Sequence, residues 1–326
     1  MGDVRHPGGR ADCAPMNPRD APPAVSDRQP PQLRFSDVTS GDGTRIRAWT
    51  NDAEGPVVLL CNALGLSPYA WPDLLRPDCG VKVWSWNARG TGGSDRPDDV
   101  QRVGVDAFAE DAVAVLDAAG IDSCPVLSWS LGVDTAAELM ASHGDRVTGL
   151  LSVAGVPGAG RSASSSVAGL LRHALTMGVA RVVDSTSWFV SPVTRRLPVT
   201  PLLTGLLRHS VVMLPSAPQD AVALTVRELL STDMDWYTHL ALARSRHRRM
   251  PLTGNSVPMT FMAGAYDLFT RPSLVRAAAQ RVANSRLVEV PGTHFLPLER
   301  GDRIRQELLD LIDRVAEAKL RTAAGE

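Results

Sequence analysis

The order of apolar segments along the chain limits its fold more than any other feature. Runs with the apolar content of strands lie at Pro56–Ala63, Gly80–Asn87, Pro125–Trp129, Val147–Gly155, Val257–Gly264 and Arg286–Val290. Segments with helical spacing of apolar residues lie between or after them, at Val105–Gly120, Asp134–His143, Pro272–Val282 and Asp302–Leu320. Strands that alternate with helices predict an α/β fold, with a mostly parallel central sheet flanked by helices.

Two segments depart from this alternation. The extended runs between Leu33 and Thr50 flank the turn signal Ser40–Gly43 and predict a hairpin. Between Pro157 and Gly254, helical pieces are interrupted by proline and glycine, and no convincing strand is found. We therefore expect one core domain made of residues 32–156 and 255–322, with a helical cap of residues 157–254 inserted into it.

The first 31 residues differ in composition from the rest of the chain. They are rich in Pro, Arg, Asp and Gly and contain few large apolar side chains. Such a segment buries too little surface to offset the entropy lost on ordering. We expect residues 1–31 to be a disordered leader, and Met16 is an alternative start of the protein.

Charge and cysteine content exclude several classes of protein. The formal net charge of −1 gives no general attraction to nucleic acid or to an anionic membrane. The cysteines, at positions 13, 61, 79 and 124, form no Cys-x-x-Cys pair and have no histidine at zinc-ligand spacing, so we expect no metal site. No apolar run reaches the roughly 18 residues of a membrane span, and no signal peptide is evident. These features predict a cytoplasmic protein without a cofactor.

The segment Ser128-Trp129-Ser130-Leu131-Gly132 lies where a strand must turn sharply into a helix. Such a turn presents its middle side chain outward, above the carboxyl edge of the sheet. Strand and helix approach closely, which demands small residues two positions before and after the tip, as Ser128 and Gly132 are. The helix N-terminus also directs free N–H groups to this point. Ser130 is therefore predicted to be an accessible nucleophile beside an anion site.

This segment resembles the nucleophile elbow of the α/β-hydrolase family, Gly-x-Ser-x-Gly, with Ser128 in place of the first glycine. The family orders its catalytic residues as Ser, Asp and His. Asp267 follows the strand that ends at Gly264, and His294 lies in the loop before the last helix. The resemblance implies that Ser130 is the nucleophile, Asp267 the acid and His294 the base. The other loop that supplies the acid in this family, here Val156–Arg161, contains no Asp or Glu.

The resemblance extends to two glycine-containing loops. It implies that the oxyanion hole is formed by the N–H groups of Leu131 and of Leu64, where Asn62-Ala63 replaces the His-Gly of the family. The segment Asn87–Asp95 is similar to the family's Asp-x-Arg-Gly-x-Gly-x-Ser loop, with Asn87 in place of Asp. This loop lacks the Lys-Ser/Thr ending of a phosphate-binding loop, which argues against a nucleotide.

Aromatic residues are the candidates for substrate contact. Trp129 lies beside the nucleophile, and Trp188 and Trp236 lie in the expected cap, where they would line an apolar acyl site. The basic run Arg244–Arg249 is interpreted as a solvated helix end.

The function implied is that of a serine hydrolase. We expect cleavage of a carboxylic ester or thioester of a small or lipid-like acyl substrate, through an acyl-enzyme and without a cofactor. The same triad would also serve a carbon–carbon bond hydrolase, a cofactor-free haloperoxidase or perhydrolase, or an acyltransferase. A non-catalytic ligand-binding protein of this fold is a further alternative. The expected partner is a small molecule, not nucleic acid or an inserted membrane, and the oligomeric state is left open.

Overall fold

The central sheet is the framework of the fold. The computed structural model describes residues 33–157, 199–245 and 250–324. In this part of the chain the sheet has eight strands, in the spatial order β1-β2-β4-β3-β5-β6-β7-β8. Their bounds are β1 Arg34–Thr39, β2 Arg45–Thr50, β3 Val57–Cys61, β4 Lys82–Trp86, β5 Cys124–Trp129, β6 Val147–Val153, β7 Met259–Gly264 and β8 Ser285–Val290.

Strand directions confirm the predicted α/β class. The β1–β2 and β2–β4 pairs are antiparallel, and every pair from β4 through β3, β5, β6 and β7 to β8 is parallel. The predicted hairpin is β1–β2, closed by a turn in which the Gly43 N–H donates to the Ser40 carbonyl at 2.9 Å. Strands β5 and β7 are buried along their whole length, as expected for parallel strands covered on both faces.

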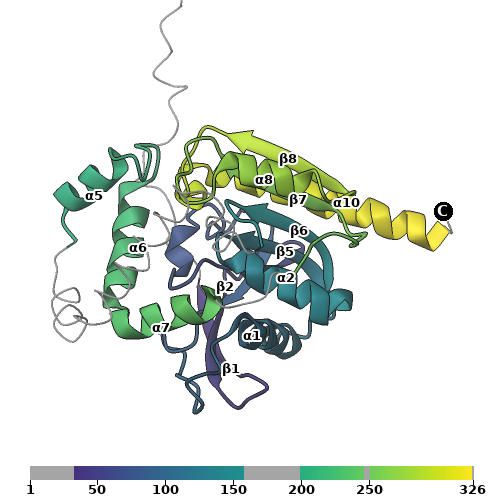
Figure 1. The fold of residues 1–326 in the computed structure, drawn as a ribbon, viewed down its shortest axis with the longest axis horizontal. Coiled ribbons are helices and arrows are strands. Elements are labelled where there is room, and N and C mark those ends of the chain that lie inside the picture. The colour runs from purple at the N-terminus through teal and green to yellow at the C-terminus, as the bar shows by residue number, and fades with distance from the viewer. Residues whose placement is uncertain (1–32, 158–198, 246–249, 325–326) are drawn as a thin grey trace, which may run out of the picture. The chain divides into compact units, whose positions relative to one another are not determined.

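Helices cover both faces of the sheet (Figure 1). Helices α1, α2 and α8 pack in one apolar cluster, and α10 packs in the other. Alternation along β5 divides its side chains between the two, since Val126 joins the first cluster and Leu127 the second. The bounds are α1 Val105–Ala118, α2 Gly132–Ser142, α8 Pro272–Ala279 and α10 Gly301–Ala324, with a short helix α9 at Leu296–Glu299.

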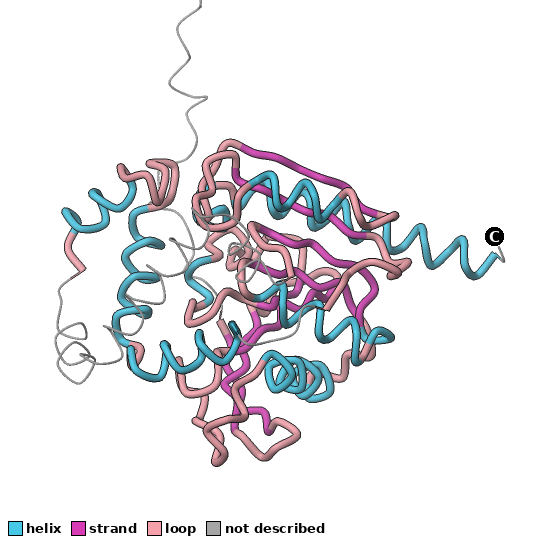
Figure 2. The backbone as a smooth tube through the Cα atoms, viewed as in Figure 1, coloured by secondary structure: helices cyan, strands magenta, loops and turns pink. Residues whose placement is uncertain are grey.

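Among the described residues between β6 and β7, three further helices are found. They are α5 Pro201–Arg208, α6 Gln219–Ser231 and α7 Met234–Ser245, green in Figure 1. Figure 2 shows helices and loops, and no strand, in the described residues 199–245. The expected cap of residues 157–254 therefore contains the predicted helices, while its limits as a separate domain stay a prediction. The expected leader, residues 1–31, lies outside the described residues.

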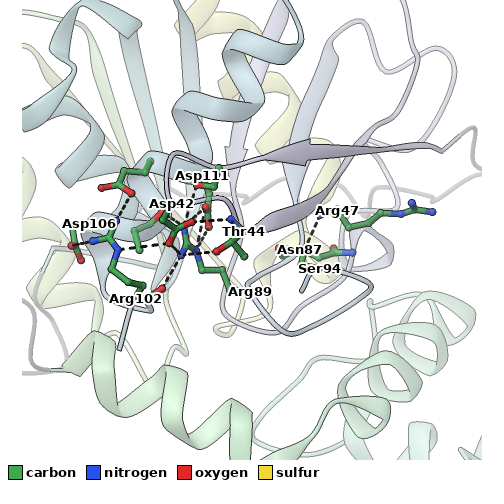
Figure 3. A network of polar contacts seen from close by, with 12 residues as sticks. Asp42, Thr44, Arg47, Asn87, Arg89, Ser94, Arg102, Asp106 and Asp111 are labelled. Atoms are coloured by element: carbon green, nitrogen blue, oxygen red, sulfur yellow. Dashed lines mark hydrogen bonds and ion pairs between the residues drawn. The ribbon is translucent and has the colours of Figure 1, made fainter. Parts of the chain in front are cut away.

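A buried arginine joins three segments next to the sheet (Figure 3). The fully buried Arg89 guanidinium donates to the Asp111 carboxylate of α1 at 2.7 and 2.9 Å, and it also contacts Asp42 in the β1–β2 turn. It donates to the Arg102 carbonyl at 2.9 Å. Burial alone would lower the pKa of Arg89, but the contacts with Asp111 and Asp42 raise it. These bonds hold the loop after β4 against the turn and α1.

None of the helices in the described residues is both long enough and apolar enough to cross a bilayer.

We predict that removing one partner of the buried pair destabilises the protein strongly. Arg89→Met leaves the Asp111 carboxylate buried without its cation, which typically costs about 3–5 kcal/mol. Urea unfolding measures the change. Arg45→Met is the matched control, because Arg45 pairs with Asp95 and Asp37 at the exposed surface and should change the unfolding free energy little. Equal effects of the two substitutions would contradict the role of Arg89.

Burial also predicts unreactive thiols. Burial raises the pKa of Cys61 to about 12 and that of Cys124 to about 11, and it raises the pKa of the buried Cys79. At pH 8 the Cys124 thiolate fraction is then about one in a thousand. In a Cys13→Ser variant we expect a disulfide reagent at pH 8 to modify these three thiols only after denaturant is added. Rapid modification of the native variant would contradict their burial.

Candidate active site

Ser130 occupies the turn between β5 and α2 in a backbone conformation that residues other than glycine rarely adopt. Its φ is +54°, in the left-handed region, although it is not a glycine. The Ser130 N–H donates to the Val153 carbonyl at the end of β6, at 3.0 Å. Helix α2 begins two residues later, at Gly132. The turn therefore places the serine side chain at the N-terminal end of a helix, where developing negative charge is favoured.

Close backbone contacts enclose this turn. A Cβ at Gly132 would lie 2.0 Å from the Cys61 carbonyl oxygen, and a Cβ at Gly155 would lie 2.6 Å from the Ser130 carbonyl oxygen. Ser128, which replaces the first glycine of the family pattern, is fully buried and pairs with Cys61 and with the neighbouring strand β6. The sheet accommodates this serine, whereas the approach of α2 to β3 leaves no room for a side chain at position 132.

The His294 imidazole connects Ser130 to Asp267. Its Nε2 lies 2.7 Å from Ser130 Oγ, and its Nδ1 lies 2.8 Å from Asp267 Oδ2. Asp267 follows β7, and its other carboxylate oxygen accepts the Phe269 and Thr270 N–H groups, each at 2.8 Å. The Asp267 side chain is fully buried, and that of His294 is 11% exposed. The structure thus brings together the three residues that sequence reasoning predicted as a triad.

Two large side chains support or border the imidazole. The fully buried Trp129 donates its indole N–H to the His294 carbonyl at 3.0 Å, which anchors the His294 backbone. The Phe269 ring centre lies 5.1 Å from that of His294, and the Phe269 side chain remains largely exposed. One side of His294 is therefore fixed from within the core, and the other faces an apolar ring at the surface.

The loops expected to form the oxyanion hole lie against each other. Leu131 packs on the apolar cluster that contains Leu64. Asn62 shapes the loop after β3, because its Oδ1 accepts the Ala63 N–H at 2.9 Å and the Trp71 indole at 3.0 Å, while its Nδ2 donates to the Leu66 carbonyl at 2.8 Å. The asparagine that replaces the family histidine therefore organises the loop. Donation by Leu64 and Leu131 to an oxyanion stays a prediction.

The structure argues against two of the proposed substrate contacts. Trp129 is completely buried, so it supports His294 from behind and does not face a substrate. Trp236 is also buried, and its indole donates to the Arg89 carbonyl at 2.7 Å. Both indoles satisfy backbone carbonyls inside the protein. Trp188 lies outside the described residues.

Arg244 is not the solvated residue that the basic run suggested. It is buried, lies over the Phe108 ring at 4.7 Å, and donates to the Leu131 carbonyl and to Thr135 Oγ1. It therefore links α7 to the first turn of α2. The rest of that run, residues 246–249, lies outside the described residues.

Sequence reasoning did not identify Glu299 or Phe269 as part of the site. Glu299 is buried and accepts hydrogen bonds from Thr293, the residue before His294. The available signal was an acidic residue directly after the apolar stretch Phe295–Leu298, because a carboxylate that is buried with such a stretch needs hydrogen-bond donors. Phe269 stands two residues after Asp267, but its contact with His294 depends on the folded loop.

Comparison with known proteins gives one family and many similar folds. A family model described as "alpha/beta hydrolase fold" matches residues 56–301. Solved structures of similar fold include an enol-lactonase from Burkholderia xenovorans LB400, at 20% identity and a TM-score of 0.60, covering 86% of this chain and 100% of that one. A thermophilic esterase from Thermogutta terrifontis matches at 18% identity and a TM-score of 0.61, covering 86% and 99%. An esterase from Exiguobacterium antarcticum matches at 16% and 0.63, covering 86% and 100%. At these identities the structures show a shared fold alone.

We predict that Gly132→Ala destabilises the protein markedly, because the added methyl group would collide with a backbone carbonyl that belongs to the central sheet. Overpacking of this kind typically costs about 1–3 kcal/mol. The control is Gly205→Ala within α5, where nothing lies within 4 Å of the added Cβ and the helix should be stabilised by about 1 kcal/mol. Urea unfolding of both variants checks the prediction, and a wild-type midpoint for Gly132→Ala would refute it.

Proposed function

Because the chain belongs to the alpha/beta hydrolase fold family, we propose that it is a serine hydrolase that cleaves a carboxylic ester or thioester through Ser130, His294 and Asp267. The observation that carries this proposal is the imidazole that lies within hydrogen-bond distance of both Ser130 Oγ and Asp267 Oδ2. In the first step Ser130 Oγ attacks the substrate carbonyl carbon while His294 Nε2 accepts the hydroxyl proton.

Asp267 has an orienting role in this step. Its Oδ2 accepts the Nδ1–H of His294, which leaves Nε2 free to accept the proton from serine. The same carboxylate stabilises the imidazolium that forms. The N–H groups of Phe269 and Thr270 hold the other oxygen in place, so the carboxylate is oriented before a substrate arrives.

The remaining steps follow from the same groups. The tetrahedral intermediate carries a negative oxygen, for which we propose the N–H groups of Leu131 and Leu64 as donors. As the intermediate collapses, His294 returns its proton to the departing alcohol or thiol, and an acyl-Ser130 ester remains. Water then attacks the acyl carbon, with His294 again accepting and returning one proton, and the carboxylic acid leaves.

Surface residues around the acid loop support an apolar substrate group. Tyr266, Leu268 and Phe269 flank Asp267 and are all exposed, with Phe269 against the imidazole. Apolar side chains exposed beside a reacting centre favour an apolar acyl or alcohol group. Esterase and lactonase names among the similar folds agree with an ester substrate. No described residue favours the carbon–carbon hydrolase, haloperoxidase or acyltransferase alternatives over the ester hydrolase.

We predict that a fluorophosphonate probe labels the wild-type protein and that Ser130→Ala abolishes the labelling. For turnover of p-nitrophenyl esters graded by acyl length, Ser130→Ala and His294→Ala should lower kcat by about 10⁴- to 10⁶-fold, and Asp267→Asn by about 10⁴-fold. Circular dichroism should show that these variants remain folded.

Matched controls for this experiment lie at the other end of α2. Ser142→Ala and His143→Ala change the same residue types at positions outside the triad and should retain labelling and turnover. Labelling that survives Ser130→Ala would disprove the nucleophile, and an unlabelled wild-type protein would favour a non-catalytic ligand-binding protein of this fold.

A further inference from the structure

Glu299 is a buried carboxylate that contacts two distant parts of the chain. It ends α9 and is 5% exposed. Its Oε2 accepts the Thr293 N–H at 2.7 Å, and its Oε1 accepts the Thr293 hydroxyl at 2.7 Å and the Leu214 N–H at 2.8 Å. No cation pairs with it among the ion pairs of the described residues. These three donors therefore replace the water that solvates an exposed carboxylate.

Thr293 directly precedes His294 in the chain. Glu299 binds both its backbone N–H and its hydroxyl, so the orientation of this residue is fixed at two points. On its other side the Thr293 carbonyl faces Gly264, where a Cβ would lie 2.4 Å from that oxygen. Thr293 is thus held between the end of β7 and the Glu299 carboxylate. A shift of either contact would move the imidazole that follows.

The third contact of Glu299, with the Leu214 N–H, connects the helical segment α5–α7 to the loop before His294. Leu214 lies between α5 and α6, and its neighbours pack on α9 in one apolar cluster with Leu298. Arg300 adds a contact from its Nη1 to Ser216 Oγ at 3.2 Å. One carboxylate oxygen of Glu299 therefore serves both the loop before His294 and the segment that precedes α6.

An amide cannot replace the carboxylate here. A glutamine has one acceptor oxygen, while its NH₂ group only donates. With three donors divided between the two oxygens of Glu299, Glu299→Gln must direct its NH₂ either at the Thr293 N–H or at the Oε1 donors. The substitution preserves shape and volume but forces at least one of these contacts apart.

We propose that Glu299 is a positioning residue for His294. Glu299 acts through Thr293 and couples the His294 imidazole to the segment that contains Leu214. This inference rests on the proposed function, since it concerns the base of that reaction. Glu299 contributes to the position of the imidazole, because it holds the backbone of the residue that precedes His294. A displacement of about 1 Å at a reacting group can lower a rate by about 100-fold.

The first test is the kinetics of Glu299→Gln, with active sites counted by fluorophosphonate labelling. We expect kcat per labelled site to fall about 10- to 100-fold while KM changes little, because substrate contacts are preserved. Thr293→Val removes the two hydroxyl contacts, with Glu299 and with the Phe295 N–H, but keeps the bond from the Thr293 N–H to Glu299, and it should lower kcat by a smaller factor. Since both changes break one unit, the double variant should be no slower than Glu299→Gln alone. Should Glu299→Gln not fold, Thr293→Val carries the test.

The control is Glu307→Gln on α10. Glu307 is also buried, but it pairs with Arg303 at 2.5 Å and with Arg286 at 3.4 Å, and in the described part of the chain no hydrogen bond or ion pair joins it to the His294 loop. We expect it to lose stability and to keep kcat per labelled site. A Glu299→Gln variant that loses stability and keeps kcat per site in the same way would overturn the proposal.

A measurement without substrate separates this inference from the proposed function. We expect the proton that His294 Nδ1 donates to Asp267 to give a low-field proton NMR signal, which shifts or broadens in Glu299→Gln and remains unchanged in Glu307→Gln. If the wild-type protein hydrolyses no ester and the signal still responds to Glu299→Gln, the proposed function fails and the positioning role stands. If hydrolysis is confirmed and neither the signal nor kcat responds, the positioning role fails alone.

Discussion

The tight passage from β5 into α2 is the constraint around which the site is arranged. Ser130 adopts a left-handed backbone there, because its N–H is bound to β6 and α2 approaches β3 without space for a side chain at Gly132. The serine hydroxyl is thereby placed at a helix N-terminus within 2.7 Å of His294. The loops after β7 and β8 need only bring one carboxylate and one imidazole to a point that the sheet has already defined.

Local patterns in the sequence predicted the sheet and the triad, but not the support around them. Apolar runs such as Pro56–Ala63 identify buried strands because burial on both faces requires them. Ser130, Asp267 and His294 were identified by their order and by their positions after strands. The burial of Arg244 was not predicted, because burial depends on residues far away in the sequence. Glu299 was missed for the same reason, since its partner Leu214 lies 85 positions earlier.

Among the contacts that join α5, α6 and α7 to the core, two involve loops that follow strands of the sheet. Trp236 of α7 donates its indole N–H to the Arg89 carbonyl in the loop after β4, and Leu214 donates to Glu299 beyond β8. Arg89 is itself held by Asp111 and Asp42, so the first contact depends on a charged cluster, while the second reaches the loop that carries His294. Each contact pairs a side chain of one part with a backbone group of the other.

The backbone at the ends of β5 and β6 is strained, and interactions elsewhere in the fold must offset that loss of stability. Ser130 and Ala154 have φ values of +54° and +48°, a region that glycine adopts without strain and other residues do not. A glycine at position 130 would relax the turn and remove the hydroxyl. The protein thus keeps the Ser130 hydroxyl at a cost in stability, and selection for thermal stability alone would favour glycine at position 130.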